Sequence, residues 1–475
     1  AGNSIESGGN YNTVVGDEAG TAITTGDNNV AVGYAALDAN TTASNNTAVG
    51  YDALTANTTG TRNVAVGTNA LDANTVGAKN VALGMDALGT NVDGSRSVAV
   101  GDSALAAQEP ASAVDMYNTA VGHGAGAAVT TGVQNTLIGG LAGDAITTGA
   151  ANTAVGYASL GAGVASYYNT AFGSLALQAD TTGRHTVAIG RNAFQAQNNT
   201  TSADMYNVAV GSSAGHSNTT GANNTFLGGK AGFANTTGAG NTALGMRALV
   251  ANTTGGSNIS IGKDSLYAQT TGSSNVAVGV SALQNNTTAS NNTAAGQSAL
   301  FANTTGTDNV ALGANALDAN TTASQNTAVG ASSLGANTTG HSNATLGAYA
   351  LNVNTTGNYN VGIGRNTMAA NTTGSNNIAV GAYALDANTT ASSNTAIGYQ
   401  SLSANTTGID NVAVGRSALL ANTTGTNNTA LGSYSLATNI TSIDNTAVGD
   451  YALHSNTAAN NTGIGSSALL SNTTG

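Results

Sequence analysis

The side chains that could act as acids, bases, nucleophiles or metal ligands are few and scattered. The chain of 475 residues has 22 Asp and Glu residues, five histidines and no cysteine, which excludes disulfides and thiolate ligands. No metal-ligand spacing relates the histidines, which are His123, His185, His216, His341 and His454. The sequence contains no recognisable nucleophile–base set and no general acid/base pair. We therefore predict no catalytic residues, no metal site and no cofactor, in a protein that is not an enzyme.

Composition also restricts the partners. Charged residues make up only 7% of the chain, and the net charge of −12 is spread thinly without a basic patch, so we expect no binding to nucleic acid. No apolar run approaches the roughly 20 residues that span a bilayer, so we expect no membrane insertion by this segment. Asn and Thr supply most of the polarity, which predicts a neutral surface of amides and hydroxyls.

A short repeat organises the whole chain. Twenty-seven segments of the type Asn-Thr-Ala-Val-Gly recur, and of the 26 intervals between their closing glycines 23 are 17 residues, two are 21 and one is 16. Such a period is typical of a stack of small identical units rather than of a globular enzyme domain. The unit is too short for a strand plus a helix. We predict an all-β fold: one continuous parallel β-solenoid domain of about 27 coils over residues 1–475.

The closing glycine of each unit is numbered here as position 0, and the other positions are counted from it. Position −1 is Val, Ile, Leu or Phe in 26 of 27 units, position −3 is almost always Thr, Val or Ile, and position +4 is Leu in 20 units. Apolar residues at i and i+2 predict a short strand with one buried face. We therefore expect positions −1, −3 and +4 to form the core, as in Val66, Val64 and Leu71.

Two further positions are nearly constant. Position −4 is Asn in 25 of 27 units, with Ser97 and Thr186 as the exceptions. Stacked Asn amides can hydrogen-bond from coil to coil and tolerate the left-handed backbone of a tight turn, so we interpret this row as a structural ladder rather than a binding row. After position +4, the recurring Thr-Thr-Gly or Thr-Thr-Ala, usually preceded by Asn, is typical of a turn.

Position −2 should point to the side opposite −1 and −3, and would then face water in an isolated solenoid. It is nevertheless Ala in 20 of 27 units and is never charged. A uniform row of small apolar residues indicates a close-packed interface, most economically among three chains around an axis. The predicted homotrimer interface comprises Ala31, Ala48, Ala65, Ala82, Ala99, Ala120, Ala154, Ala188, Ala209, Ala243, Ala277, Ala311, Ala379, Ala413 and Ala447.

Two four-residue insertions, near 106–118 and 195–207, interrupt the period. Both end in Asp-Met-Tyr-Asn, and each is followed by two units with Gly at position +4. We predict lateral bulges in which Met116, Tyr117, Met205 and Tyr206 could contact a partner. The alternative is that the bulges only accommodate the inserted residues.

The segments Asn46-Thr-Ala-Val-Gly-Tyr-Asp-Ala-Leu54 and Asn63-Val-Ala-Val-Gly-Thr-Asn-Ala-Leu71 resemble the head repeats of YadA-type trimeric autotransporter adhesins. They resemble even more closely the repeat shafts of phage tail fibres and related surface fibres, which often carry a C-terminal self-cleaving chaperone domain. The resemblance covers essentially the whole chain. It implies a left-handed parallel β-roll, a side-by-side homotrimer and an extracellular, cell-surface or virion location. The adhesin head unit is somewhat shorter than 17 residues, and the resemblance does not distinguish a bacterial adhesin from a viral fibre.

Three functions follow as hypotheses. The first is a structural fibre shaft that spaces or presents a receptor-binding element, and the second is an adhesin that binds glycans or host matrix through its lateral face. The third is an ice-binding solenoid, which would need outward Thr rows on strands, whereas the Thr-Thr pairs precede Gly in an apparent turn. The expected partners are therefore other copies of the chain and a cell-surface glycan or receptor. Because the sequence starts at Ala1 and stops within a repeat, we expect a segment of a longer protein.

Overall fold

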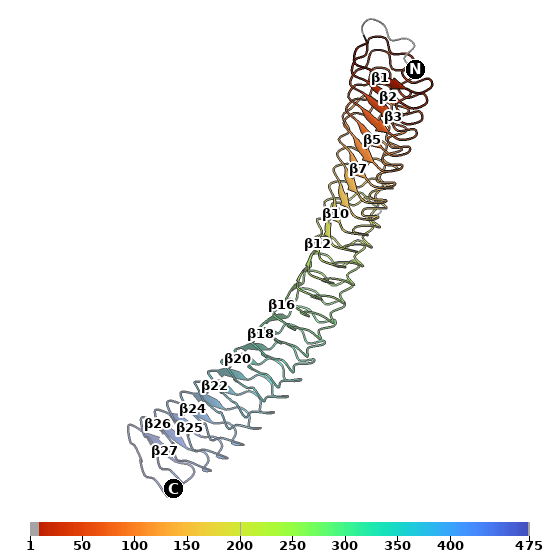
Figure 1. Ribbon diagram of the computed structural model, residues 1–475. Coiled ribbons are helices and arrows are strands. Elements are labelled where there is room, and N and C mark those ends of the chain that lie inside the picture. Colours follow the sequence, from red (N-terminus) through yellow and green to blue (C-terminus); the bar gives the residue numbers. More distant parts are fainter. Residues whose placement is uncertain (1–8, 200, 474–475) are drawn as a thin grey trace. The chain divides into compact units, whose positions relative to one another are not determined.

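The computed structural model describes residues 9–199 and 201–473, which form two compact units, one up to Gly240 and one from Asn241 onward. Each unit is a parallel β-solenoid, in which the chain winds once per repeat and places one three-residue strand in each coil (Figure 1). The described residues contain 27 strands and no helix. The predicted parallel β-solenoid of about 27 coils with a 17-residue period is confirmed.

The strands of the first unit are β1 (Thr13–Val15), β2 (Val30–Val32), β3 (Thr47–Val49), β4 (Val64–Val66), β5 (Val81–Leu83), β6 (Val98–Val100), β7 (Thr119–Val121), β8 (Thr136–Ile138), β9 (Thr153–Val155), β10 (Thr170–Phe172), β11 (Val187–Ile189), β12 (Val208–Val210) and β13 (Thr225–Leu227). Those of the second unit are β14 (Thr242–Leu244), β15 (Ile259–Ile261), β16 (Val276–Val278), β17 (Thr293–Ala295), β18 (Val310–Leu312), β19 (Thr327–Val329), β20 (Ala344–Leu346), β21 (Val361–Ile363), β22 (Ile378–Val380), β23 (Thr395–Ile397), β24 (Val412–Val414), β25 (Thr429–Leu431), β26 (Thr446–Val448) and β27 (Thr462–Ile464).

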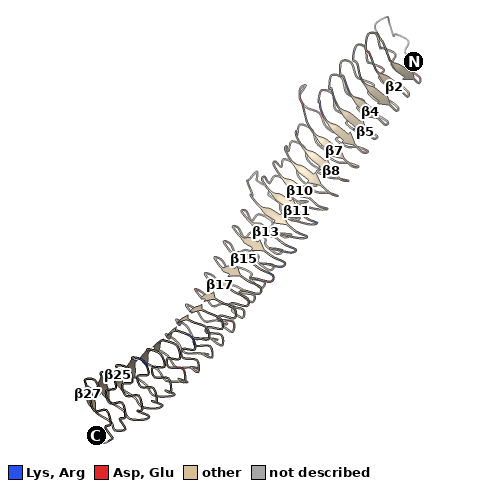
Figure 2. Cartoon of the chain, turned by 60° about the vertical axis from the view of Figure 1, so that its left-hand side comes forward, with Lys and Arg blue, Asp and Glu red and all other residues tan. Residues whose placement is uncertain are grey.

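Within each unit, consecutive strands pair in parallel and equivalent positions lie side by side, as Ala48 beside Ala65. The insertions do not disturb this register, because Ala99 still pairs with Ala120 and Ala188 with Ala209. Figure 2 shows two loops of the first unit that project beyond the neighbouring coils, and only sparse charged residues among the rest. The four extra residues of each insertion are therefore accommodated outside the strands.

Backbone hydrogen bonds join neighbouring coils around their whole circumference, not only at the strands. The amide of Leu54 donates to the carbonyl of Ala70 at 3.0 Å, and that of Thr58 donates to Thr75 at 3.0 Å. The side-chain hydroxyl of Thr58 donates to the same Thr75 carbonyl at 3.1 Å. Since a buried backbone group without a partner is costly, this pattern makes each coil depend on the next one.

The glycine at position 0 is required by two constraints at once. Its φ lies near +135°, as in Gly173 (φ +137°), a region that residues with a Cβ avoid. A Cβ on Gly173 would also lie 2.6 Å from the carbonyl carbon of Gly190 in the next coil. The backbone conformation and the close stacking of the coils thus each require glycine at this position.

The side chains that fill the coil differ in part from the sequence prediction. Leu71 at position +4 is fully buried, as expected, but Val66 at position −1 is 36% exposed and Val64 at −3 is only half-buried. The interior is filled by alanines at positions −2 and +3, such as Ala65 and Ala70. The predicted burial of positions −1 and −3 is wrong, because the coil is so thin that its strand has room inside for one small side chain.

Large residues in the alanine row show this packing directly. Leu137 replaces Ala at position −2, and its methyl groups lie 2.7 Å from where a Cβ on Gly126 or Gly143 would be. Each of these glycines stands where a regular coil has Leu at position +4. Phe226 likewise lies beside Gly215 and Gly232. Because a large side chain at position −2 occurs beside glycines at position +4, the total volume of the core side chains is kept, as close packing requires.

The asparagine row at position −4 forms the predicted ladder. Asn63 is fully buried; its Oδ1 accepts from the backbone amide of Asn80 at 2.9 Å, and its Nδ2 donates to the carbonyl of Gly77 at 2.8 Å. The left-handed residue of this turn is the one before it, Arg62, with φ +62°. The ladder is therefore confirmed, whereas the left-handed conformation lies one position earlier than expected.

A second buried amide row lies at position +7, in the segment interpreted from sequence only as turn chemistry. Asn320 is fully buried, and its Nδ2 donates to Oδ1 of Asn303 at 2.9 Å and to the carbonyl of Ala323 at 3.0 Å. Its Oδ1 accepts from Nδ2 of Asn337 at 3.0 Å. Each regular coil thus buries two carboxamides together with one leucine and two alanines.

The exceptions Ser97 and Thr186 in the first amide row also have a structural reason. Each faces a glutamine at position +7, whose side chain is one methylene longer than Asn. Ser97 Oγ donates to Oε1 of Gln108 at 3.1 Å, and Nε2 of Gln197 donates to Oγ1 of Thr186 at 3.0 Å. The shorter residue in one row therefore accommodates the longer residue in the other, at the coil where each insertion begins.

Replacement of a ladder amide should destabilise its own coils. We expect Asn320→Ala to weaken them by about 2–5 kcal/mol, because it leaves buried polar groups of both neighbouring coils unpaired. Hydrogen exchange of the amides in residues 300–340 would measure this as faster local opening. Thr322→Ala, at an exposed position of the same coil, serves as the control and should change exchange little. Equal protection in the two variants would contradict the structural role of the ladder.

Asp180 replaces Asn in the second amide row and should make stability depend on pH. Burial raises the pKa of its carboxyl to about 6, although the backbone amides of Asn199 and Gly183 hydrogen-bond to it and favour the ionised form. The folded state therefore holds a proton that the unfolded state releases, and stability should fall as pH rises from about 4 to 6. Asp180→Asn should remove this dependence and stabilise the protein at pH 7 by at most about 3 kcal/mol. Thermal melting of both proteins at pH 4.5 and pH 7 checks this. The same change in melting temperature between the two pH values in both proteins would contradict it.

Candidate functional site

The alanine row at position −2, which the sequence analysis assigned to a trimer interface, lies inside the coil. All fifteen predicted interface alanines are fully buried within the single chain. At the same position, a Cβ on Gly362 would lie 2.6 Å from Cδ1 of Leu351, at position +4 of the coil before, so this row faces the core leucines. The prediction that this row contacts neighbouring chains is therefore wrong, although its cause, the need for a small apolar residue in close packing, was recognised.

The surface that the strands present outward is instead formed by positions −3 and −1, and it is called the strand face here. In the first unit Leu83 is 38% exposed and Phe172 is 54% exposed; in the second unit Leu346 is 53% exposed. Neither position is charged in any coil, and position −3 alternates among Thr, Val and Ile with Ala344 as the one smaller residue. Along each unit the strand face is thus an uncharged stripe, apolar at position −1 and divided between Thr and aliphatic residues at position −3.

The strand face of the second unit is hollowed at β19–β21. A depression of about 250 Å³ is lined there by Thr327, Val329, Leu346, Val361 and Ile363 together with the smaller Ala344. It exists because Ala344 stands where other coils have Thr, Val or Ile. The depression is apolar and open, and could receive one aliphatic side chain of a partner.

The insertion coils place their predicted contact residues differently. Met116 and Met205 are buried, at 0% and 1% exposure, so the prediction that they contact a partner is wrong. Met116 turns inward, where its Cγ would lie 3.2 Å from a Cβ on Gly94. It fills interior space that the longer loop leaves. Tyr117 and Tyr206, at 50% and 56% exposure, do lie on the surface, and their contact with a partner stays a prediction.

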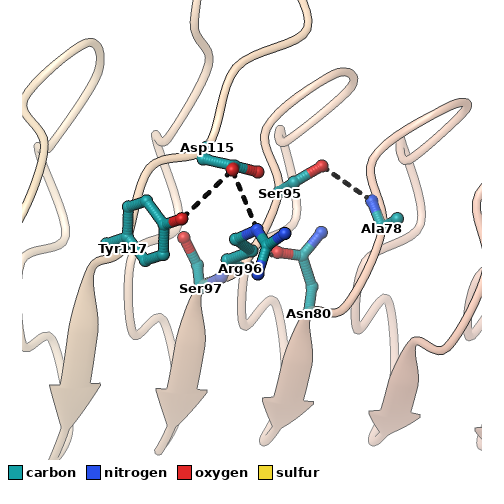
Figure 3. Close-up of polar contacts among 7 residues, drawn as sticks. All are labelled: Ala78, Asn80, Ser95, Arg96, Ser97, Asp115 and Tyr117. Atoms are coloured by element: carbon teal, nitrogen blue, oxygen red, sulfur yellow. Dashed lines mark hydrogen bonds and ion pairs between the residues drawn. The ribbon is translucent and has the colours of Figure 1, made fainter.

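Tyr117 is held by a small polar cluster next to the first insertion. Figure 3 shows Asp115 between Arg96 and Tyr117; its Oδ2 lies 2.8 Å from Nε of Arg96 and accepts from the Tyr117 hydroxyl at 3.2 Å. The guanidinium also lies 5.6 Å from the centre of the Tyr117 ring. Because these groups are well exposed, the cluster orients Tyr117 and contributes little to stability.

The second insertion carries a related cluster with an aromatic stack. The ring of His185 lies 5.1 Å from that of Tyr168 and 5.3 Å from that of Tyr206, with planes nearly parallel. Asp204 accepts a hydrogen bond from the Tyr206 hydroxyl at 3.1 Å, which raises the pKa of that tyrosine. Its other oxygen lies 3.5 Å from Nε2 of His185. The two insertions thus present the same Asp–Tyr pair on the surface.

The remaining titratable groups do not converge. In the part of the chain that the structure describes, no three His, Asp or Glu side chains come together as a metal ion would require. His216 stacks on Phe233 at 4.9 Å, and burial lowers the pKa of His216. Among the same residues no helix is long and apolar enough to span a membrane.

Comparison with known protein families finds no family model that matches this chain, and comparison with curated proteins finds no significant match.

The five methionines offer a test of these side-chain positions. Met85 and Met246 are about half exposed, whereas Met116, Met205 and Met368 are buried. Because oxidation to the sulfoxide follows exposure, mild hydrogen peroxide should modify Met85 and Met246 first. Peptide mass spectrometry over a time course would measure the five rates, and unfolded protein gives the reference rates. Oxidation of Met116 and Met205 as fast as that of Met85 would show that the insertions expose them.

Proposed function

We propose that this chain is the shaft of an extracellular or virion fibre, which spaces or presents a receptor-binding element. The observation that carries the proposal is the uncharged strand face, which continues along each unit with half-exposed aliphatic side chains. Contiguous apolar surface beyond a few hundred Å² is uncommon on a monomer and marks an interface. A shaft built of side-by-side chains would cover it.

The same face supports three identical chains as the occupant. Every coil presents equivalent positions, so a second copy in the same orientation meets a matching repeat at each level of the stack. Three strand faces directed at a common axis would bury the stripe of every chain. The proposed homotrimer has the assembly state that the fibre and adhesin resemblance implies, and we propose left-handed coils on the same ground. Its interface, however, uses positions −3 and −1 in place of position −2.

The side chains of the strand face favour a protein partner over ordered water. They range in size from Ala295 to Phe172, and the depression at Ala344 breaks the stripe further. Such variation suits interdigitated packing, whereas an ice surface has one fixed spacing. The ice-binding hypothesis therefore receives less support than the fibre hypothesis.

Charges introduced on the strand face should prevent assembly. We expect the wild-type chain to sediment with three times the mass of one chain, and Val329→Lys with Ile363→Lys to sediment as a single chain, because desolvating a lysine in an apolar interface is costly. Analytical ultracentrifugation measures both masses. The substituted side chains already face solvent in one chain, so the coils should stay folded.

The matched control places the same charges on another face. Thr339→Lys with Thr356→Lys changes two exposed residues of nearby coils outside the strand face, and should leave the trimer intact. A monomeric wild-type protein with the circular dichroism of a β-solenoid would contradict the proposal. So would a trimer that survives the strand-face substitutions.

A further inference from the structure

A pocket of about 280 Å³ opens on the surface of the first unit, outside the strand face, where three consecutive coils meet. Leu141, Asp144, Tyr157, Gly161 and Gln178 contribute to its lining. The volume is slightly below the 300–1,000 Å³ that is common for small-molecule sites. It therefore suits one small ring rather than a larger ligand.

Gly161 creates this pocket. It stands at position +5, between Asp144 of the coil before and Gln178 of the coil after. Its φ is not in the left-handed region, so the backbone does not require glycine there. A Cβ on Gly161 would lie 3.4 Å from Oδ1 of Asp144. The missing side chain thus opens space directly beside a half-buried carboxylate.

Tyr157 forms one wall with an uncovered ring. Its side chain is 58% exposed, and the residues at the same position of the adjacent coils are the small Gly140 and Ser174. The ring passes over Gly140, with Cδ2 3.8 Å from where a Cβ would be. In the same row Tyr34 and Tyr51 instead stack on each other at 5.2 Å. Tyr157 has no such neighbour and offers its ring to a ligand.

Besides the Tyr157 hydroxyl, the polar side chains of the pocket offer one acceptor and one donor. Asp144 presents its carboxylate, and burial raises the pKa of Asp144 against hydrogen bonds from the backbone amides of Asp144 and Ala145. The Gln178 amide oxygen already accepts from Nε2 of Gln195 at 2.9 Å. Nε2 of Gln178 has no acceptor among the described residues, so it can donate to a ligand. No basic side chain lines the pocket.

We propose that this pocket binds one pyranose ring of a neutral glycan. The apolar face of the sugar would lie on Tyr157, one hydroxyl would donate to Asp144, and a second hydroxyl oxygen would accept from Nε2 of Gln178. A ligand that pairs with all three groups must offer an apolar face, a hydrogen-bond donor and a hydrogen-bond acceptor. A pyranose offers the first through its ring C–H groups and the other two through neighbouring hydroxyls. A simple ammonium ion would use the carboxylate and the ring but leave the amide donor unpaired. The inference does not depend on the fibre role, because it concerns a different surface.

Saturation-transfer difference NMR on the full chain tests the proposal. The probes are the methyl pyranosides of glucose, galactose, mannose and N-acetylglucosamine. We expect at least one to receive saturation, most strongly at the ring protons that lie on Tyr157. Tyr157→Ala and Asp144→Asn should each weaken binding about tenfold or more, whereas Tyr157→Phe should retain it. Gly161→Gln, which fills the pocket, should abolish it.

Asp318→Asn is the matched control. Gly335 stands beside Asp318 as Gly161 stands beside Asp144, with its Cβ position 3.3 Å from Oδ1, but Ala331 replaces the tyrosine. This variant should bind the sugar as the wild type does. Unchanged circular dichroism of all variants shows that the coils remain folded. The proposal is overturned if no glycoside receives saturation, if Tyr157→Ala binds unchanged, or if methylammonium displaces the bound glycoside.

Discussion

The structure depends on hydrogen bonds that run from coil to coil through the interior. The carbonyl of Gly60 accepts from Nδ2 of both Asn46 and Asn57, so the two amide rows meet at one backbone group and fix the register of neighbouring coils. One leucine and two alanines per coil bury too little apolar surface to offset the ordering of 17 residues. Buried carboxamides are stable only when every donor and acceptor is paired, and an identical coil above and below provides that pairing.

This dependence explains why substitutions come in compensating sets. A longer Gln108 occurs with a shorter Ser97, and a bulky Leu137 with glycines at position +4 on both sides. Polar exceptions follow the same rule: Ser260 in the alanine row lies 2.6 Å from the hydroxyl of Ser265. In a thin coil each interior residue lies next to its equivalents one repeat away, so a change of size or polarity is commonly matched by a local partner, although the buried Gln269 occurs beside Asn258 and Asn275 without a shorter residue.

The sequence predicted the repeat, the strands and the first amide ladder, because these depend on period and residue type alone. It did not predict which side of the strand faces inward. Alternation along a strand shows that positions −1 and −3 share a face. The assumption that the larger apolar side chains of a strand face the core then placed Val64 and Val66 inside. The thickness of the coil determines which face of the strand is buried, and this thickness cannot be read from the sequence of one strand. One feature of the sequence did indicate the orientation: the large residues Leu137 and Phe226 at position −2 occur in coils where glycine replaces Leu at position +4. Such an exchange of volume between two positions indicates that both lie in the same core. The pocket at Tyr157 could not be foreseen, because it needs residues from three coils.

Because the interior is committed to stacking, specific recognition must come from the outer rows, and these divide into two kinds. Rows that repeat without interruption, such as the strand face, offer the same chemistry at every level and suit a partner with the same period. Recognition of a single small ligand instead needs a break in a row, since uniform rows enclose no volume. Gly161 is such a break: a residue type that the backbone does not demand removes one side chain and exposes the carboxylate and amide of the coils on either side. Such a break is not sufficient by itself, because Gly335 stands beside Asp318 in the same way but Ala331 replaces the tyrosine; it is the combination of Gly161 with Tyr157 that distinguishes this coil.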